Sequence, residues 1–187
     1  MELKPENFPG KVRKDDHNQN NPDWENVTRE EHRLLYSFNL FKFIAEEQGV
    51  DLKNSKIIEL GSGNTVFLDY ARKQGLDIIG LDVNPRGVKE SPQVIARIEQ
   101  LPFPDATFDV IYSSFIFDSY VYNQNPDMMA KEILRILKPG GAYISFELRM
   151  PITLLADFEL WRSGAERGVY APMAFFRKPL NNVKDGP

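Results

Sequence analysis

The chain contains no cysteine among its 187 residues. This absence excludes disulfides, thiolate zinc sites and a cysteine nucleophile, and it fits a reducing compartment, so we expect a cytoplasmic protein. With only two histidines, His17 and His32, a multi-histidine metal site is excluded and no metal is expected. No apolar run approaches the roughly 18 residues of a membrane span. The segment from Met1 to Asn21 is polar where a signal peptide would be apolar.

Neither sign of charge is in large excess. Lys and Arg number 23 and Asp and Glu number 27, which gives a net charge of -4. This balance argues against bulk binding of nucleic acid or of an anionic membrane. The length suits one domain of roughly 150 residues or slightly more. The 42% of hydrophobic residues supplies enough material for a core.

Three segments differ in composition. Residues 1–26 are polar with scattered prolines, which predicts a flexible N-terminal arm, although Trp24 gives it a reason to order over a ligand. Residues 27–176 form the predicted domain, and residues 177–187 form a loose C-terminal tail.

The predicted domain begins with a helix over residues 28–48. Thr28 and Glu31 form a capping box, and apolar residues follow at helical spacing. Continuous branched runs predict buried strands at 56–60 and 77–82, separated by a helix over 65–74 that ends at Gly75. Further strands are predicted at 93–97, 108–113 and 142–148, with a helix over 126–137. This alternation predicts an α/β fold with an open, doubly wound, mostly parallel sheet.

The pattern after Leu148 is weaker. Residues 152–164 read as another helix, and residues 169–176 as a late strand that Pro172 restricts to the edge of the sheet. We therefore expect a shortened C-terminal part.

The loop after the first strand carries the first candidate site. Gly61 and Gly63 let a ligand approach the backbone, and the next helix begins with free N–H groups. Glu59 would repel a pyrophosphate but hold an ammonium or sulfonium group, and Val66 stands where a dinucleotide loop needs a third small residue. The alternative is an ordinary strand-to-helix turn, which also contains glycines.

Asp82 ends the second predicted strand. An acidic side chain there can accept both hydroxyls of a ribose, as in other doubly wound sheets. A capping or turn aspartate is the alternative.

The segment from Ile95 to Ser114 contains LPFPD-x-x-FD, and LRILKPGGAYISFE follows it from Leu134. With the glycine loop and Asp82, these motifs resemble the class I S-adenosylmethionine-dependent methyltransferases, especially the group that acts on small molecules. The resemblance covers about half of the chain, from Ile57 to Phe146. It implies a Rossmann-like methyltransferase fold.

The resemblance also implies a set of cofactor contacts. The acidic-x-Gly-x-Gly motif would hold the amino acid part, Asp82 the ribose, and the residues after the third strand the adenine, while Ser113 would lie near the methyl group. The implied cofactor-binding residues are Glu59, Leu60, Gly61, Ser62, Gly63, Asp82, Val83, Arg97, Ile98 and Ser113.

The sequence departs from the family at three places. Arg97 stands where an aspartate usually contacts adenine, and guanidinium cannot accept a hydrogen bond. Adenine would then be held by the Ile98 backbone and stacking, or Arg97 would turn outward while Glu99 accepts. Thr65 replaces a frequent glycine. The chain after Leu148 looks too short for a final helix and the antiparallel hairpin of the family.

The acceptor side is less defined. Asp118 is the candidate general base, and Tyr36, Tyr120 and Tyr122 are candidate substrate contacts, with capping and packing roles as the alternatives. We expect methyl transfer to a small molecule by in-line displacement, with S-adenosylhomocysteine as product and proximity as the main catalytic effect. A protein acceptor is the alternative, and an exposed sheet edge would allow a homodimer.

Two other functions stay open. A cofactor-binding module without catalysis would keep the same motifs. A nicotinamide-dependent oxidoreductase would share the glycine loop and Asp82, but Glu59, Val66 and the lack of a Tyr-x-x-x-Lys constellation disfavour it.

Overall fold

The computed structural model describes residues 29–84, 91–117, 125–146, 159–162 and 173–180. Within these ranges one seven-stranded sheet has the order β3-β2-β1-β4-β5-β7-β6. The strands are β1 (Lys56–Leu60), β2 (Asp77–Asp82), β3 (Gln93–Ile95), β4 (Phe108–Ser114), β5 (Leu137–Phe146), β6 (Glu159–Arg162) and β7 (Met173–Arg177). The helices are α1 (Arg29–Glu47), α2 (Val66–Lys73) and α3 (Pro126–Ile136), with a short 3-10 turn at Leu52–Asn54.

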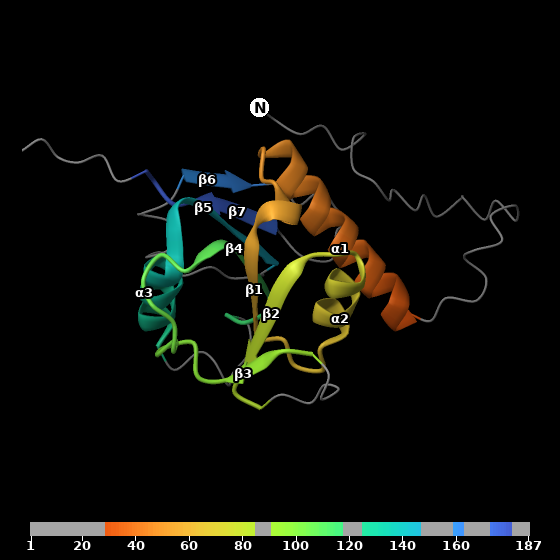
Figure 1. Cartoon of the computed structure of the whole chain (residues 1–187), viewed down its shortest axis with the longest axis horizontal. Helices are drawn as coiled ribbons and strands as arrows, with labels where there is room; N and C mark the ends of the chain where they lie inside the picture. Colours follow the sequence, from red (N-terminus) through yellow and green to blue (C-terminus); the bar gives the residue numbers. More distant parts are fainter. Residues whose placement is uncertain (1–28, 85–90, 118–124, 147–158, 163–172, 181–187) are drawn as a thin grey trace, which may run out of the picture.

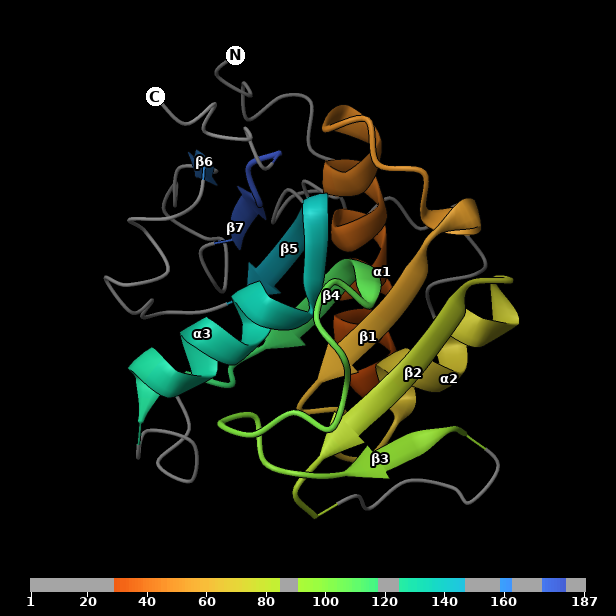
Figure 2. The ribbon, with the colours of Figure 1, turned by 60° about the vertical axis from the view of Figure 1, so that its left-hand side comes forward.

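Strands β1 to β5 run parallel, whereas β7 lies antiparallel between β5 and β6. Helices α1 and α2 cover one face of the sheet and α3 covers the other (Figures 1 and 2). The predicted doubly wound α/β sheet is therefore confirmed. Its parallel strands β1, β2 and β4 end at one edge, where such folds bind ligands.

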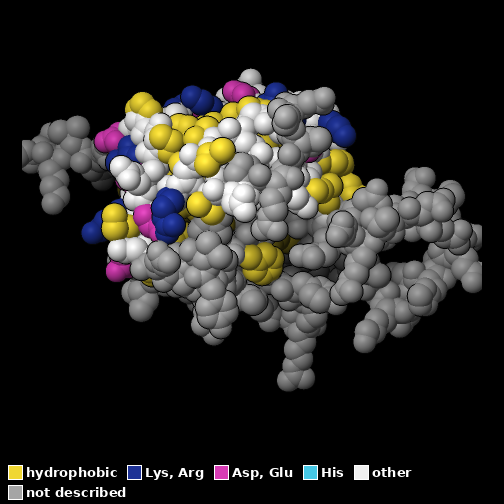
Figure 3. Space-filling model, turned by 90° about the horizontal axis from the view of Figure 1, so that it is seen from below, with side chains coloured by type: hydrophobic (Ala, Val, Ile, Leu, Met, Phe, Trp, Pro, Cys, Tyr) yellow, Lys and Arg dark blue, Asp and Glu magenta, His cyan; other side chains and the backbone are white. Residues whose placement is uncertain are grey.

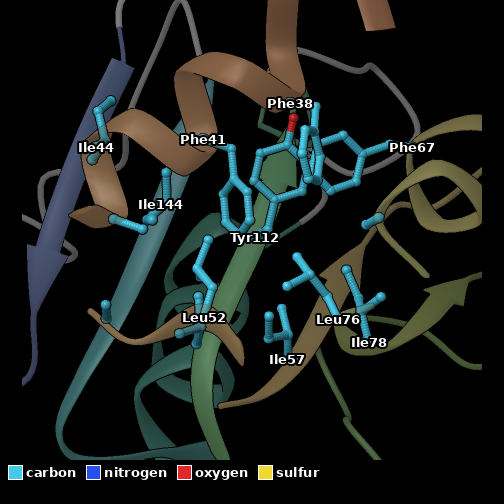
Figure 4. Packing of buried hydrophobic residues seen from close by; sticks show 14 of the residues in the cluster. Phe38, Phe41, Ile44, Leu52, Ile57, Phe67, Leu76, Ile78, Tyr112 and Ile144 are labelled. Carbon is cyan, nitrogen blue, oxygen red and sulfur yellow. The ribbon is translucent and has the colours of Figure 1, made fainter. Parts of the chain in front are cut away.

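The first face is packed with aromatic rings. Phe67 of α2 stacks on Tyr112 of β4 with ring centroids 4.0 Å apart, and Phe41 of α1 meets Tyr112 edge-on at 5.0 Å (Figure 4). Tyr112 is only 1% exposed. Such pairs contribute about 0.5–1.5 kcal/mol each beyond the burial of area. They fix α2, and with it the loop that precedes α2, against the centre of the sheet.

The second face is packed by aliphatic residues of α3. Ile133 and Met129 are fully buried against Ile111 of β4, and the LPFPD segment adds Leu101 to the same cluster. Asn125 caps α3 by accepting a hydrogen bond from the Met128 N–H at 3.1 Å. The predicted helices 28–48, 65–74 and 126–137 thus match α1, α2 and α3 to within a residue or two at each end.

Strand β5 starts earlier than the sequence predicts. The KPGG segment belongs to this strand, because Gly140 and Gly141 exchange backbone hydrogen bonds with Lys178. A pattern that reads as a helix stop is here the start of a ten-residue strand.

The C-terminal part is more complete than predicted. Residues 159–162 form β6 instead of part of a helix, and β7 lies inside the sheet instead of at its edge. Pro172 does not conflict with this position, because the strand begins at the next residue. The antiparallel hairpin, for which we expected too little chain beside a final helix, is therefore present, and it buries Phe175 and Phe176 on opposite faces.

Strand β7 extends one residue past the predicted domain boundary at residue 176. Arg177 ends β7, and the Lys178 ammonium donates to the backbone oxygens of Leu134 and Leu137 at 2.8 and 2.7 Å. The predicted arm of residues 1–26 lies outside the described residues. No helix within the described residues is long and apolar enough to cross a membrane.

Candidate functional site

The glycine loop is tied to the end of β2. The Gly61 and Ser62 N–H groups both donate to the Leu81 backbone oxygen, at 2.8 and 3.0 Å. Asp82 accepts from the Gly63 N–H at 2.9 Å and from the Asn84 N–H at 2.7 Å. The second predicted carboxylate therefore lies against the predicted loop, and the structure brings these two parts of the candidate site together.

Gly61 is needed for both conformation and space. Its φ of +76° lies in the left-handed region, and a Cβ there would meet Ile116 Cγ2 at 2.7 Å. Ile116 follows β4 and is buried. The loop after β1 therefore packs directly against the segment after β4.

Glu59 is buried near the end of β1, at 6% exposure. Its Oε2 is buried and has no hydrogen-bond partner. Burial, and then the negative charges of Asp69 and Asp82, raise the pKa of Glu59 to about 8 from an ordinary value of 4.5. A buried acceptor without a partner is costly, and a cationic donor would satisfy it.

Thr65 stands where the family often has a glycine. It has φ +63° immediately before α2, a conformation that a glycine adopts more easily. The Thr65 hydroxyl donates to Asp69 at 2.8 Å, and Asp69 also accepts from Ser91. A side-chain hydrogen bond from Thr65 to Asp69 of α2 therefore accompanies the left-handed backbone at the start of this helix.

The segment after β3 turns sharply at the adenine position that the resemblance implies. The Gln100 N–H donates to the Arg97 oxygen at 3.2 Å, and Ile98 inside this turn is fully buried. The Arg97 side chain is 48% exposed and pairs with Glu99 Oε1 at 2.9 Å. Glu99 itself is 11% exposed, and its Oε2 has no hydrogen-bond partner.

Ser113 belongs to a buried cluster of hydroxyl groups. Its oxygen lies 2.7 Å from the Tyr143 hydroxyl and 3.0 Å from the Ser145 hydroxyl, and all three residues are at most 1% exposed. The cluster joins β4 to β5 near their carboxyl ends. The sequence did not predict this network, because Tyr143 and Ser145 are read as ordinary strand residues.

The LPFPD segment is clamped to α3. Arg135 donates to the backbone oxygens of Leu101 and Phe103 at 2.9 and 2.7 Å, and it forms ion pairs with Glu132 and Asp105. Glu132 in turn accepts from the Leu101 N–H at 2.7 Å. Glu132 and Arg135 are one helical turn apart, which is the signal that could have identified them.

The remaining predicted residues are less informative. Leu60 is buried in the core, Ser62 is buried and accepts from the Gln93 amide at 2.8 Å, and Val83 is half-buried after β2. The predicted acceptor-side residues Asp118, Tyr120 and Tyr122 lie outside the described residues, as does Trp24, and the side chain of Tyr36 is not described. Among the residues that are described, no group of three or more His, Asp or Glu side chains is arranged to hold a metal ion.

Hydrophobic side chains gather on the described part of the face toward which β1 and β2 point, with charged groups mostly around them (Figure 3). The exposed large hydrophobic residues include Val66 at the start of α2, Ile95 at the end of β3 and Phe115 after β4. Phe115 has φ +58°, and its N–H donates to the Phe146 oxygen at 2.7 Å. Phe115 is thus an exposed aromatic residue with a left-handed backbone at the edge where folds of this kind bind ligands.

Comparisons with known proteins agree with this geometry. Residues 58–145 match the family model described as "Methyltransferase domain". A sterol 4-C-methyltransferase of Caenorhabditis elegans is 32% identical over 110 residues, which cover 51% of this chain and 32% of that protein. A 2-methyl-6-phytyl-1,4-hydroquinone methyltransferase of Synechocystis is 30% identical over 130 residues, 64% of this chain and 34% of that protein.

The crystal structure of the PH0226 protein from Pyrococcus horikoshii has the same fold, with a TM-score of 0.60 at 14% identity. The match covers 86% of this chain and 97% of that chain. The matched stretch and the sheet order are similar to those of the class I S-adenosylmethionine-dependent methyltransferases. The cofactor of this family is S-adenosyl-L-methionine. The chain spans about a third of the length of the two curated relatives.

Proposed function

We propose that this chain binds S-adenosyl-L-methionine at the carboxyl ends of β1 and β2 and transfers its methyl group to a small molecule. The observation that carries the proposal is that Glu59, a buried carboxyl group with an unsatisfied oxygen, and Asp82 both lie near the carboxyl ends of adjacent parallel strands. These two residues fit the α-ammonium group and the ribose hydroxyls of a nucleoside that carries an amino acid.

Glu59 would hold the α-ammonium group. An ammonium supplies a hydrogen-bond donor and a positive charge, and both favour the ionised carboxylate. The left-handed Gly61 and Gly63 keep side chains away from the loop backbone, so the ligand can approach it closely.

Asp82 would accept the ribose hydroxyls. A carboxylate offers about four acceptor sites, and Asp82 uses two of them for the backbone N–H groups of Gly63 and Asn84. The same side chain would then fix the loop and the nucleoside together. Ligand binding and loop position are coupled in this arrangement.

When bound, the cofactor supplies a methyl group on a positively charged sulfur, which a nucleophile can attack in line. The contribution of this chain is to orient the two reactants and exclude water. Such positioning can provide about 7–11 kcal/mol of the barrier reduction. Asp118 remains our candidate for a base where the acceptor must lose a proton.

A small molecule is the proposed acceptor. Both relatives described above are named for small apolar acceptors, a sterol and a phytyl hydroquinone. In this chain Val66, Ile95 and Phe115 present apolar surface near the ends of the parallel strands. These residues support an acceptor with an apolar face, and we place the protein in the cytoplasm on the basis of its cysteine-free sequence.

The test has a binding step and a turnover step. Calorimetry with S-adenosylhomocysteine at pH 8.5 is expected to show binding, and Glu59→Gln is expected to weaken it while the exposed Glu46→Gln does not. Release of S-adenosylhomocysteine from S-adenosylmethionine is then measured over a panel of sterols, quinols, fatty acids and a protein mixture.

Each outcome separates the functions. Formation of methylated small molecule supports the proposal, and methylation of protein alone would overturn its acceptor. Binding without turnover across the panel would support the non-catalytic module. Uptake of NAD with no uptake of S-adenosylhomocysteine would support an oxidoreductase instead.

A further inference from the structure

The glycine loop after β1 is held by a side chain of β3 as well as by β2. Gln93, the first residue of β3, donates from its side-chain amide to the Ser62 hydroxyl oxygen at 2.8 Å. The two residues are 31 positions apart in the chain. Because β3 is the edge strand and β2 separates it from β1, this bond reaches across β2 to the loop (Figure 2).

Gly80 of β2 leaves the space through which this bond passes. In the parallel pair β2–β3 Gly80 lies opposite Gln93, and its N–H donates to the Pro92 oxygen at 2.9 Å. A Cβ at Gly80 would meet Ser62 Oγ at 2.7 Å and Leu68 Cδ2 at 2.9 Å. The Ser62 side chain therefore lies directly over the backbone of β2, where a side chain of β2 would otherwise stand.

Ser62 gives the loop a side chain by which it can be held. It stands between Gly61 and Gly63, which have φ of +76° and +48°. Glycine loses more conformational freedom than any other residue when its backbone is ordered, so a loop of this kind is costly to fix. Ser62 is buried, at 4% exposure, and its bond to Gln93 adds a fixed point in the middle of the loop.

The segment that contains β3 also holds the far end of the loop. The Ser91 hydroxyl donates to Asp69 of α2, and Asp69 accepts from the Thr65 hydroxyl at 2.8 Å. The Thr65 N–H in turn donates to the Ser62 backbone oxygen at 2.8 Å. Ser91 and Gln93 are two residues apart, so one short segment fixes both the middle of the loop and the start of α2.

We infer that Gln93 is a positioning residue for cofactor binding, which acts through Ser62 to hold the glycine loop in its binding conformation before a ligand arrives. The inference rests on the proposed function and deepens it. A ligand that binds an ordered loop loses less conformational entropy than one that must order the loop itself. Gln93 therefore contributes to affinity without touching the ligand.

The experiment uses variants that remove this one bond. Gln93→Met keeps the length of the side chain and removes the amide, Ser62→Ala removes the acceptor, and the double variant removes both. Gln74→Met is the matched control, because Gln74 is exposed at the end of α2. Thermal melts establish the temperature at which all four variants and the unaltered chain are folded.

Amide hydrogen exchange of the ligand-free proteins, followed by NMR, measures the order of the loop. The loss of one neutral hydrogen bond corresponds to about 3- to 10-fold in an equilibrium constant. Exchange at Gly61, Ser62 and Gly63 is therefore expected to be about 3- to 10-fold faster in Gln93→Met, relative to exchange at Ile58, which is fully buried in β1. An equal increase at Ile58 would show a general loss of stability and overturn the positioning role.

Calorimetry with S-adenosylhomocysteine measures the consequence for binding. Gln93→Met and Ser62→Ala are each expected to bind about 3- to 10-fold more weakly than the unaltered chain, whereas Gln74→Met is not. The double variant is expected to bind no more weakly than the weaker single variant, because both changes remove the same contact. Losses that multiply in the double variant would overturn the route through Ser62.

The two measurements separate this inference from the proposed function. Unchanged affinity of a folded Gln93→Met would overturn the role of Gln93 and leave the proposed function standing. Failure of the unaltered chain to bind S-adenosylhomocysteine would overturn the proposed function, and with it the part of Gln93 in cofactor binding. Faster loop exchange together with weaker binding, both absent from Gln74→Met, would support the inference.

Discussion

Gly63 donates its backbone N–H to Asp82 Oδ2 at 2.9 Å, so the carboxylate that ends β2 holds the loop that follows β1. This bond joins the loop that follows β1 to the last residue of β2, the strand that runs parallel to β1. The two sequence features that suggested a nucleoside site are thus one structural unit. A change at Asp82 is expected to act on the loop and on the ligand together.

Asp82→Ala is expected to weaken binding of S-adenosylhomocysteine by about 1–3 kcal/mol, because polar partners of the carboxylate are left unpaired. Calorimetry measures the affinity. Asp77→Ala is the matched control, since Asp77 is exposed at the start of the same strand. Equal affinity of a folded Asp82→Ala and of the control would contradict the ribose assignment.

Gly61→Ala and Gly63→Ala are expected to have different effects, the first mainly on the stability of the fold and the second mainly on the affinity for S-adenosylhomocysteine. At Gly61 a Cβ meets Ile116 at 2.7 Å, so Gly61→Ala should lower the free energy of unfolding by about 1–3 kcal/mol. At Gly63 the nearest protein atom is 3.9 Å away, so only the strain at φ +48° remains, about 1 kcal/mol. Gly63→Ala should nevertheless lose affinity for S-adenosylhomocysteine.

Urea unfolding and calorimetry check this contrast. Ile116→Ala combined with Gly61→Ala relieves the contact but not the left-handed strain, so the pair of changes should cost less than the sum of the single ones. Strict additivity of the two stability losses would show that Gly61 and Ile116 are not coupled through this contact. Undiminished binding of S-adenosylhomocysteine by Gly63→Ala would show that the ligand does not approach the loop backbone at Gly63.

The parallel half of the fold could be predicted from sequence because its signals are local. The runs KIIEL and DIIGLD are continuous and branched, and the helix between them fixes a parallel pair. Strand β6 and the place of β7 within the sheet were missed because β7 pairs with β5, which lies much earlier in the chain. Strand β7 enters between β5 and β6, and the run around Trp161 suits a helix or a strand equally well.

The residues of the candidate site likewise include some with a local sequence pattern and some whose surroundings depend on the folded chain. Glu59 and Asp82 were predicted because strand ends and glycine loops have a sequence pattern. Arg97 was named from its position along the chain, whereas its exposure and its pairing with Glu99 depend on a turn that the sequence does not reveal. The unsatisfied oxygens of Glu59 and Glu99 become visible only once all their neighbours are placed.

Glu59→Gln is expected to stabilise the free protein at high pH. The pKa of Glu59 is raised to about 8 in the fold, against an ordinary 4.5, so the folded state binds more protons than the unfolded state between these values. Stability must then fall as pH rises through this window. Glutamine removes the ionisation, so Glu59→Gln should gain on the order of a few kcal/mol over the unaltered chain at pH 8.5 and little at pH 4.

Melting temperatures over pH 4–9 measure this effect. Glu46→Gln is the control, because Glu46 is exposed on α1. A difference between Glu59→Gln and the unaltered chain that does not grow with pH would show that Glu59 is ionised throughout.

Cofactor affinity is expected to rise with pH, in the opposite direction to stability. An ammonium group binds the ionised form of Glu59, so binding below the pKa of about 8 must release a proton. Calorimetry of S-adenosylhomocysteine in buffers of different ionisation enthalpy counts that proton at pH 7. The count should drop toward zero in Glu59→Gln, and a count of zero in the unaltered chain would exclude the ammonium contact or the protonated state.

Arg135→Ala is expected to release the LPFPD segment from α3. The change leaves the backbone oxygens of Leu101 and Phe103 without this donor and removes two ion pairs, of which that with the exposed Asp105 contributes little. We expect a loss of about 2–4 kcal/mol in the free energy of unfolding, measured in urea. Lys131→Ala, exposed on the same helix, should cost less than about 0.5 kcal/mol. A folded Arg135→Ala that loses no more stability than Lys131→Ala would mean that the segment keeps its place without the clamp.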